Sequence, residues 1–243
     1  MGCINKTVIS FLMLFIVSSA FSQVTSGKII FERKTNLKKR FKDNPRFLKM
    51  INDDNKIKRE MFELVFNDTS SAFIPIEDED APGGMMSYMT SQNTIYQDLE
   101  ADTYLAIIDL YGSEALLGDS IPQREWKVTN SKRSLGGYRC TKAIWEQNDS
   151  TRVYAWFSPD IVPSVGPEGF SGLPGAILGL ATEDGGIIYF AKEVIIEPAK
   201  TELLSYDTGK KDVYSKQALI EILVEKMGKY TSRENIVGMF GWY

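Results

Sequence analysis

The side chains that carry most enzyme chemistry are scarce in this sequence. Its 243 residues include two cysteines and no histidine. Histidine is the commonest general base, the usual partner of serine and cysteine nucleophiles, and a frequent metal ligand. Its absence excludes all of those sites. What remains is carboxylate, lysine, tyrosine or cysteine chemistry, or no chemistry at all.

Cys140 is the one candidate thiol nucleophile, because Cys3 lies in an N-terminal segment that we expect to be cleaved off. Strand alternation places Tyr138, Cys140 and Lys142 on one face, and an exposed thiol beside Lys142 would be activated. The alternative is a buried structural cysteine, which is the more usual state of this residue. A cysteine-dependent enzyme at Cys140 is therefore one alternative function, but the balance favours a protein that is not an enzyme.

Three methionines form a second candidate site. Met85, Met86 and Met89 follow an acidic cluster at residues 77–80 and a Pro-Gly-Gly turn at 82–84. Thioethers are soft ligands suited to Cu(I), so a copper-binding loop is another alternative. The four adjacent carboxylates lack the spacing of a calcium loop. A loop without metal is the simpler interpretation, and no cofactor is expected.

Residues 1–22 have the pattern of a secretory signal peptide. Their apolar run, residues 8–21, is shorter than the roughly 18 residues that a membrane-spanning helix needs. Small residues, Ala20 and Ser22, precede Gln23 at the −3 and −1 positions. We therefore expect cleavage between Ser22 and Gln23. The product would be exported to the periplasm, the outer membrane or the medium, with no transmembrane segment in the mature chain.

The overall charge argues against nucleic-acid binding. The chain has 28 basic and 32 acidic residues, and its composition, 43% hydrophobic and 25% charged, is that of a globular protein. Residues 34–49 concentrate seven basic side chains against one acid. In an acidic, exported protein, a solvated face on a short helix explains this segment better than a nucleic-acid site does.

Strand-like segments separated by short turns dominate the rest of the chain. They are rich in β-branched and aromatic residues, and in residues 29–34 the side chains alternate between two faces, with Arg33 on the face of Ile29 and Phe31. This pattern predicts an antiparallel meander rather than βαβ units. The predicted strands are 29–34, 62–66, 72–76, 94–99, 104–110, 126–130, 138–146, 152–157, 177–182 and 187–196.

Helices are few. Asn44 and Pro45 predict the start of a short helix, and residues 213–227 predict a longer one with an apolar stripe that ends at Gly228. We expect an α+β, β-rich fold: a half-barrel-like antiparallel sheet covered by this C-terminal helix and the short N-terminal one. No repeat or linker divides residues 23–243, so one domain is expected.

A segment rich in proline and glycine stands apart. Residues 159–186 hold four of the nine prolines and seven of the nineteen glycines. Proline fixes φ and glycine permits positive φ, so this spacing predicts a defined, irregular path. No Gly-Lys-Ser/Thr follows the glycines, so the segment is not a phosphate-binding loop.

The same segment carries a family resemblance. Residues 172–177 read GLPGAI, residues 137–143 read GYRCTKA, and residues 155–161 read AWFSPDI. With these motifs the whole of residues 23–243 resembles the GLPGLI family, a group of exported proteins from Bacteroidota-type bacteria. The family has no established activity. The resemblance therefore implies an exported, β-rich protein without indicating a reaction.

We predict that the Pro/Gly segment forms the rim of a binding site. The candidate residues are Trp156, Phe170, Gly172, Leu173, Pro174 and Gly175. Ordinary sheet core is the alternative for the aromatic members. The expected function is a non-enzymatic, exported protein that binds an unidentified envelope ligand or protein partner.

Overall fold

The computed structural model describes residues 23–78, 89–110, 113–148, 151–229 and 231–243. The predicted signal peptide, with Ser22 at its end, lies outside the described residues, and so do Met85 and Met86. Gln23 is the first described residue and is exposed.

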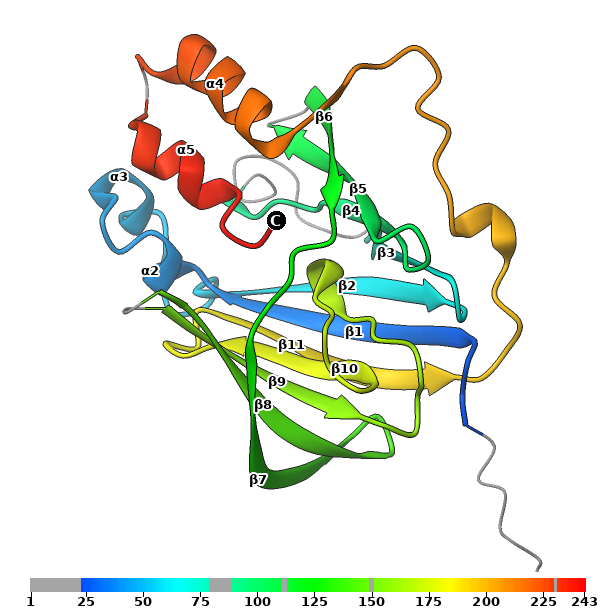
Figure 1. Ribbon diagram of the computed structural model, residues 1–243. Helices are drawn as coiled ribbons and strands as arrows, with labels where there is room; N and C mark the ends of the chain where they lie inside the picture. The colour runs from blue at the N-terminus through cyan, green and yellow to red at the C-terminus, as the bar shows by residue number, and fades with distance from the viewer. Residues whose placement is uncertain (1–22, 79–88, 111–112, 149–150, 230) are drawn as a thin grey trace, which may run out of the picture.

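Within the described residues, twelve strands form one sheet (Figure 1). They are β1 (Gly27–Asn36), β2 (Ile57–Phe66), β3 (Ser70–Ile76), β4 (Thr94–Asp98), β5 (Thr103–Leu110), β6 (Ser113–Ser120), β7 (Trp126–Leu135), β8 (Tyr138–Asn148), β9 (Thr151–Ser158), β10 (Ala176–Thr182), β11 (Ile187–Ile195) and β12 (Val213–Tyr214). The helices are α2 (Leu37–Arg40), α3 (Pro45–Leu48), α4 (Lys216–Met227) and α5 (Arg233–Met239), with 3₁₀ turns η2 (Pro167–Gly169) and η3 (Thr201–Leu203).

The sheet consists of two antiparallel meanders that share a central seam. Its order is β12-β6-β5-β4-β3-β2-β1-β11-β10-β9-β8-β7, so β1 pairs with β11 where the two meanders meet. Among the described strands of the sheet, β12 and β6 form the one parallel pair. The predicted β-rich, α+β fold with an antiparallel meander is confirmed, although β6 and β12 were absent from the predicted strands.

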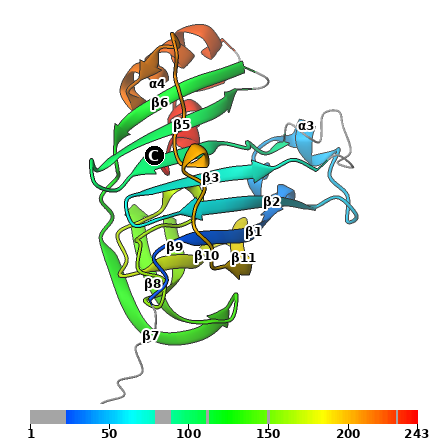
Figure 2. The same cartoon turned by 90° about the vertical axis from the view of Figure 1, so that its right-hand side faces the viewer.

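The two ends of the sheet are drawn toward each other by one short connection. Residues 121–125 join β6, near one end of the sheet, to β7 at the other end. Five extended residues reach at most roughly 18 Å. The sheet must therefore curl, and Figure 2 shows its strands following a curve from β6 to β7. The result is an open bowl with a concave and a convex face.

The concave face carries the hydrophobic core. Ile29 and Phe31 on β1 are fully buried, as are Phe62 on β2 and Tyr189 on β11, while the intervening side chains are more exposed. The Phe62 ring stacks on that of Phe73, with centroids 4.9 Å apart. Arg33 lies on this same buried face, as the alternation in β1 predicts.

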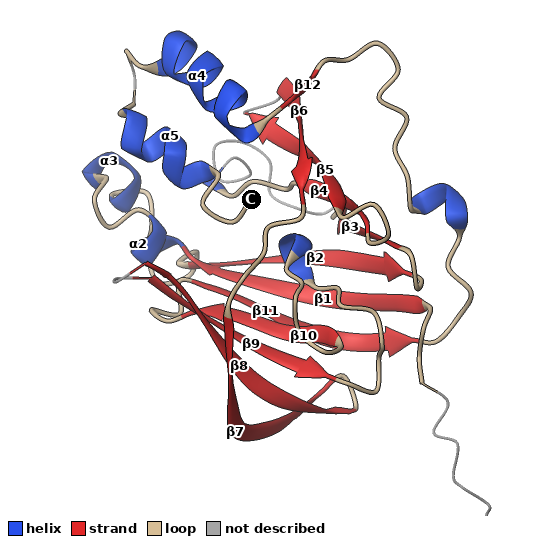
Figure 3. Cartoon of the chain, in the orientation of Figure 1, coloured by secondary structure: helices blue, strands red, loops and turns tan. Residues whose placement is uncertain are grey.

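The helices gather at one end of the sheet (Figure 3). The predicted helix after Asn44 is confirmed as α3, with the Asn44 side chain accepting a hydrogen bond from the Phe47 amide. The C-terminal helix begins at Lys216 rather than at Val213. The cause is local: Ser215 caps the first turn by accepting from the Ala218 amide, and residues 213–214 pair with β6 instead. None of the described helices is long and apolar enough to cross a bilayer.

The Pro/Gly segment crosses the concave side of the sheet between β9 and β10 (Figure 1). The Ser164 hydroxyl accepts hydrogen bonds from the amides of Gly172 and Leu173, at 2.7 and 3.2 Å. The indole of Trp126 donates to the Ser171 carbonyl at 2.9 Å. These bonds fix an irregular path, as the proline and glycine spacing predicts.

The conformation of Gly175 gives a direct test of that path. Gly175 has φ +129°, and a Cβ there would lie 2.1 Å from the Ser158 carbonyl oxygen. We expect Gly175→Ala to lower the free energy of unfolding by about 2–5 kcal/mol, through strain and overpacking together. Chemical denaturation measures the change.

Gly137→Ala is the matched control. Gly137 has φ +86°, but a Cβ there would meet no heavy atom within 4 Å. Its substitution should cost only the conformational part, about 1 kcal/mol. Equal losses in the two variants would contradict the proposed steric conflict at Gly175.

Candidate functional site

Strand register brings three polar residues together in the middle of the apolar face. Arg33 on β1 lies opposite Glu60 on β2 and, on its other side, opposite Tyr189 on β11. All three side chains are buried. The guanidinium also lies 4.7 Å from the centroid of the Phe62 ring. A buried charge in such a setting requires bonded partners.

Arg33 has those partners for each of its N–H groups. Nε and Nη2 donate to Glu60 Oε2 at 3.0 and 2.7 Å, and Nη2 also donates to the Ser91 carbonyl at 2.8 Å. Nη1 donates to the Tyr189 hydroxyl at 3.1 Å and, weakly, to Glu168 Oε1 at 3.5 Å. Five donors thus meet five acceptor contacts, which is the full capacity of a guanidinium.

Glu60 is held in its ionised form. Burial alone would raise its pKa, but the charges of Arg33 and Lys58 and the hydrogen bond from Thr90 outweigh burial, so the pKa lies below its ordinary value. Thr90 donates to Glu60 Oε1 at 2.6 Å, and Lys58 Nζ lies 3.1 Å from the same oxygen. Arg33, Glu60 and Lys58 therefore form a tightly bonded charged cluster.

Glu168 in η2 completes the network from above the sheet. Its backbone is left-handed, at φ +53° and ψ 28°, a conformation that is uncommon for residues other than glycine. Its carboxylate is buried and accepts hydrogen bonds from the hydroxyls of Tyr189 and of Tyr243, the latter at 3.0 Å. Burial raises the pKa of both tyrosines well above the ordinary value, so they remain hydrogen-bond donors at neutral pH.

The segment after α5 closes over this network. The Tyr243 hydroxyl accepts from Asn93 Nδ2 at 2.8 Å, and the Trp242 ring packs edge-on against Phe170, with centroids 5.3 Å apart. Arg124 donates to the Trp242 carbonyl and lies 4.2 Å from the centroid of Phe170. Residues from both meanders thereby hold the segment in place.

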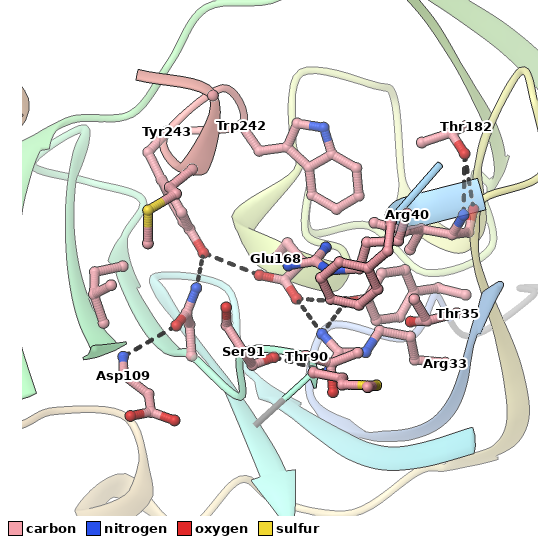
Figure 4. Close-up of a pocket in the computed structure, with 18 of the residues that line it drawn as sticks. Arg33, Thr35, Arg40, Thr90, Ser91, Asp109, Glu168, Thr182, Trp242 and Tyr243 are labelled. Carbon is pink, nitrogen blue, oxygen red and sulfur yellow. Dashed lines mark hydrogen bonds and ion pairs between the residues drawn. The ribbon is translucent and has the colours of Figure 1, made fainter. Parts of the chain in front are cut away.

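Four residues of the network, Arg33, Glu168, Tyr189 and Tyr243, border a cavity of about 380 Å³, shown in Figure 4. Glu168 and Arg33 lie at its floor, with Tyr243 pointing toward Glu168. Its walls come from β1, β11, the α2–α3 region, residues 89–93, β5 and the α5 segment. The lining residues are Arg33, Thr35, Arg40, Phe41, Phe47, Met89, Thr90, Ser91, Asn93, Ile108, Asp109, Glu168, Thr182, Ile187, Tyr189, Gly238, Met239, Trp242 and Tyr243.

The predicted rim residues do not line this cavity. Within the Pro/Gly segment, Phe170 and Leu173 turn into the core and are buried, and Gly175 is buried as well. Gly172 and Pro174 are exposed on the segment itself. Their role in binding stays a prediction.

Trp156 lies on the opposite face of the sheet from Phe170 and Leu173. Its neighbours Ala155 and Phe157 belong to the concave core, so alternation turns Trp156 to the convex face. There Arg133 lies 4.8 Å from the centroid of its ring. The structure therefore brings Phe170 and Leu173 together but places Trp156 elsewhere.

The methionine loop and Cys140 are the two alternative sites, and the structure describes them to different extents. Met89 is buried in a small apolar cluster with Leu37 and Ile51, so packing accounts for its position. Because Met85 and Met86 lie outside the described residues, copper binding stays a prediction. Cys140 is fully buried, and burial raises its pKa to about 11, which favours the structural cysteine over a nucleophile.

Neither a role for Glu168 nor the network itself was predicted from the sequence. One signal was present: Arg33 and Glu60 fall at apolar positions of strand patterns. A charged residue on a buried face usually has a partner. The partners from η2, β11 and the α5 segment are distant in sequence, and no local pattern points to them.

Comparisons with known proteins find a similar fold and a family of unknown function, and they indicate no activity. Residues 145–179 match a family described as a protein of unknown function (Porph_ging), and this stretch covers β9 and residues 159–179 of the Pro/Gly segment. The match is compatible with the GLPGLI resemblance, which stays a prediction. No curated protein matches the sequence.

Two solved structures of PNGF-II have a similar fold. The structure in space group C2 has a TM-score of 0.53 and 13% identity, over 88% of this chain and 32% of that one. The structure in space group P21 has a TM-score of 0.55 and 12% identity, over 82% and 33%. The chain thus spans about a third of PNGF-II, and at such identity the likeness concerns the fold alone.

The lowered pKa of Glu60 predicts how the stability of the fold depends on pH. Its ionised form stabilises the fold above pH 4.5, the ordinary pKa, and this contribution is lost as the pH falls through the lower pKa of the folded state. We expect the free energy of unfolding, measured by urea denaturation, to fall below about pH 4.5.

Glu60→Gln isolates this effect from that of other carboxylates. The variant should be less stable at pH 7, by about 3–5 kcal/mol, because Arg33 loses the nearer of its two carboxylate partners. Its stability should also vary less between pH 5 and pH 3 than that of the wild type. Parallel pH profiles for the two proteins would contradict the role of Glu60.

Proposed function

We propose that the protein is an exported, non-enzymatic binding protein that holds a small molecule in the cavity above Glu168. The observation that carries this proposal is the combination of a cavity of about 380 Å³ with a floor whose charged groups are already bonded to one another. The volume lies within the roughly 300–1,000 Å³ typical of small-molecule sites.

The bonding of the floor favours binding over catalysis. A general acid or base must exchange a proton with the substrate. Here Glu60 is fixed in its ionised form by Arg33 and Lys58, and the tyrosine protons are directed at Glu168. Such a network is a rigid support for a ligand. The buried, weakly acidic thiol of Cys140 offers no better nucleophile.

The walls supply apolar contact area. Phe41 and Phe47 pack against each other with ring centroids 4.7 Å apart, and Trp242 and Met239 approach from the α5 segment. A few polar groups within an aromatic enclosure are usual for a site that orients a small molecule. An envelope protein as partner, rather than a small molecule, is an outcome that the following experiment distinguishes.

A variant that narrows the cavity tests binding. Gly238 lines the cavity on α5, and a Cβ there would meet no heavy atom within 4 Å, so Gly238→Phe should fold. We expect ligand-observed NMR with a library of neutral, anionic and cationic small molecules to find ligands for the wild type. Gly238→Phe should weaken them at least tenfold.

Val237→Phe is the matched control, because Val237 is exposed on the same helix and does not line this cavity. Its affinities should equal those of the wild type. If no compound binds, or if Gly238→Phe binds as the wild type does, the cavity is not a small-molecule site. Capture of an envelope protein that depends on the same cavity would then favour a protein partner.

Export has its own test. Expressed in a bacterial host from Met1, the protein should be recovered from the envelope or medium, with Gln23 as its N-terminal residue by mass spectrometry. A version lacking residues 2–22 should remain in the cytoplasm. Recovery of the intact N-terminus in the cytoplasm would show that residues 1–22 are not a cleaved signal peptide.

A further inference from the structure

The hydrogen-bond donors at the cavity floor are already used. The N–H groups of Arg33 bind Glu60, Ser91, Tyr189 and Glu168, as described above. The hydroxyl hydrogens of both tyrosines point to Glu168. A ligand that approaches this floor therefore finds none of these donors free.

Acceptor capacity remains on Glu168. A carboxylate accepts about four hydrogen bonds. Oε1 accepts from Tyr189 and Arg33, whereas within the described residues Oε2 accepts one bond, from Tyr243. The group that meets Oε2 must therefore donate a hydrogen bond, as a hydroxyl, amide or ammonium does.

Charge narrows the choice further. Two basic residues, Arg33 and Arg40, and two acidic residues, Glu168 and Asp109, line the cavity, so their formal charges cancel. A charged ligand would lose hydration on entering this partly enclosed space without meeting an opposite net charge. A neutral ligand avoids that cost.

The walls define the remaining property of the ligand. Phe41, Phe47 and Trp242 line the cavity beside the polar floor, and the rings of Phe41 and Phe47 pack against each other. A ligand that fits must have an apolar face to pack on the rings and donor groups along one edge to reach Glu168. Hydroxyl groups on a saturated ring meet both conditions without carrying charge.

We infer that the cavity selects a neutral, hydroxyl-rich small molecule with an apolar face, of the kind that a simple sugar ring presents. Hydroxyl groups donate to Glu168 Oε2, and the C–H face of the ring packs on Phe47 and Trp242. This inference rests on the proposed function, since it assigns a ligand class to the same cavity.

Three sugars on one carbon skeleton test the inference. In mildly acidic buffer, about pH 6, D-glucose is neutral, D-glucosamine is cationic and D-glucuronate is anionic. We expect titration by NMR and calorimetry to give the wild type at least tenfold higher affinity for glucose than for either charged sugar. Phe47→Ala, which removes a half-buried wall residue, should weaken glucose binding at least fivefold, while Val237→Phe should not change it.

The possible results separate this inference from the proposed function. Equal or tighter binding of glucosamine or glucuronate overturns the inference, as does absence of binding by all three sugars. If the library described above still yields a ligand that Gly238→Phe rejects, the proposed function stands and only the ligand class is wrong. If no compound of any class binds, both fail.

Discussion

A buried guanidinium is the constraint on which the centre of this structure depends. Arg33 lies on the apolar face of β1, where an unpaired charge would be prohibitively costly. The register of β1 with its neighbours supplies Glu60 on one side and Tyr189 on the other. A shift of one residue in either pairing would turn these side chains to the opposite face. The charge therefore favours one register of the central strands, in addition to the apolar pattern around it.

The same cluster connects parts of the chain that are far apart in sequence. Glu168 brings the Pro/Gly segment to the cluster, and Tyr243 brings the segment after α5. Both contacts lie on the concave face of a sheet that must curl because residues 121–125 bridge its two ends. Curling produces the enclosure, and the polar cluster fixes what lies at its floor. The cavity follows from both together.

Much of the fold was predictable, because it depends on local patterns. Alternation and turn residues located ten of the strands, and Asn44 with Pro45 located α3. The strand β6 was missed because its residues, Ser113–Ser120, include glycine and two acids and no β-branched side chain. Helix α4 starts late because Ser215 is a better cap than the preceding residues and because β12 pairs with β6. The candidate site was less predictable: the motif-bearing segment was recognised, but Phe170 and Leu173 pack into the core and Trp156 faces away.

By itself, the sequence determined the β-rich class, the irregular course of the Pro/Gly segment and the exclusion of histidine chemistry, since these depend on composition and on contacts between near neighbours. It also placed Arg33 on an apolar face without indicating how its charge is balanced. Only the tertiary structure decided that Glu60, Glu168, Tyr189 and Tyr243 converge there. The physical reason is that such convergence depends on strand register and on the curl of the whole sheet, which bring distant residues within hydrogen-bonding range.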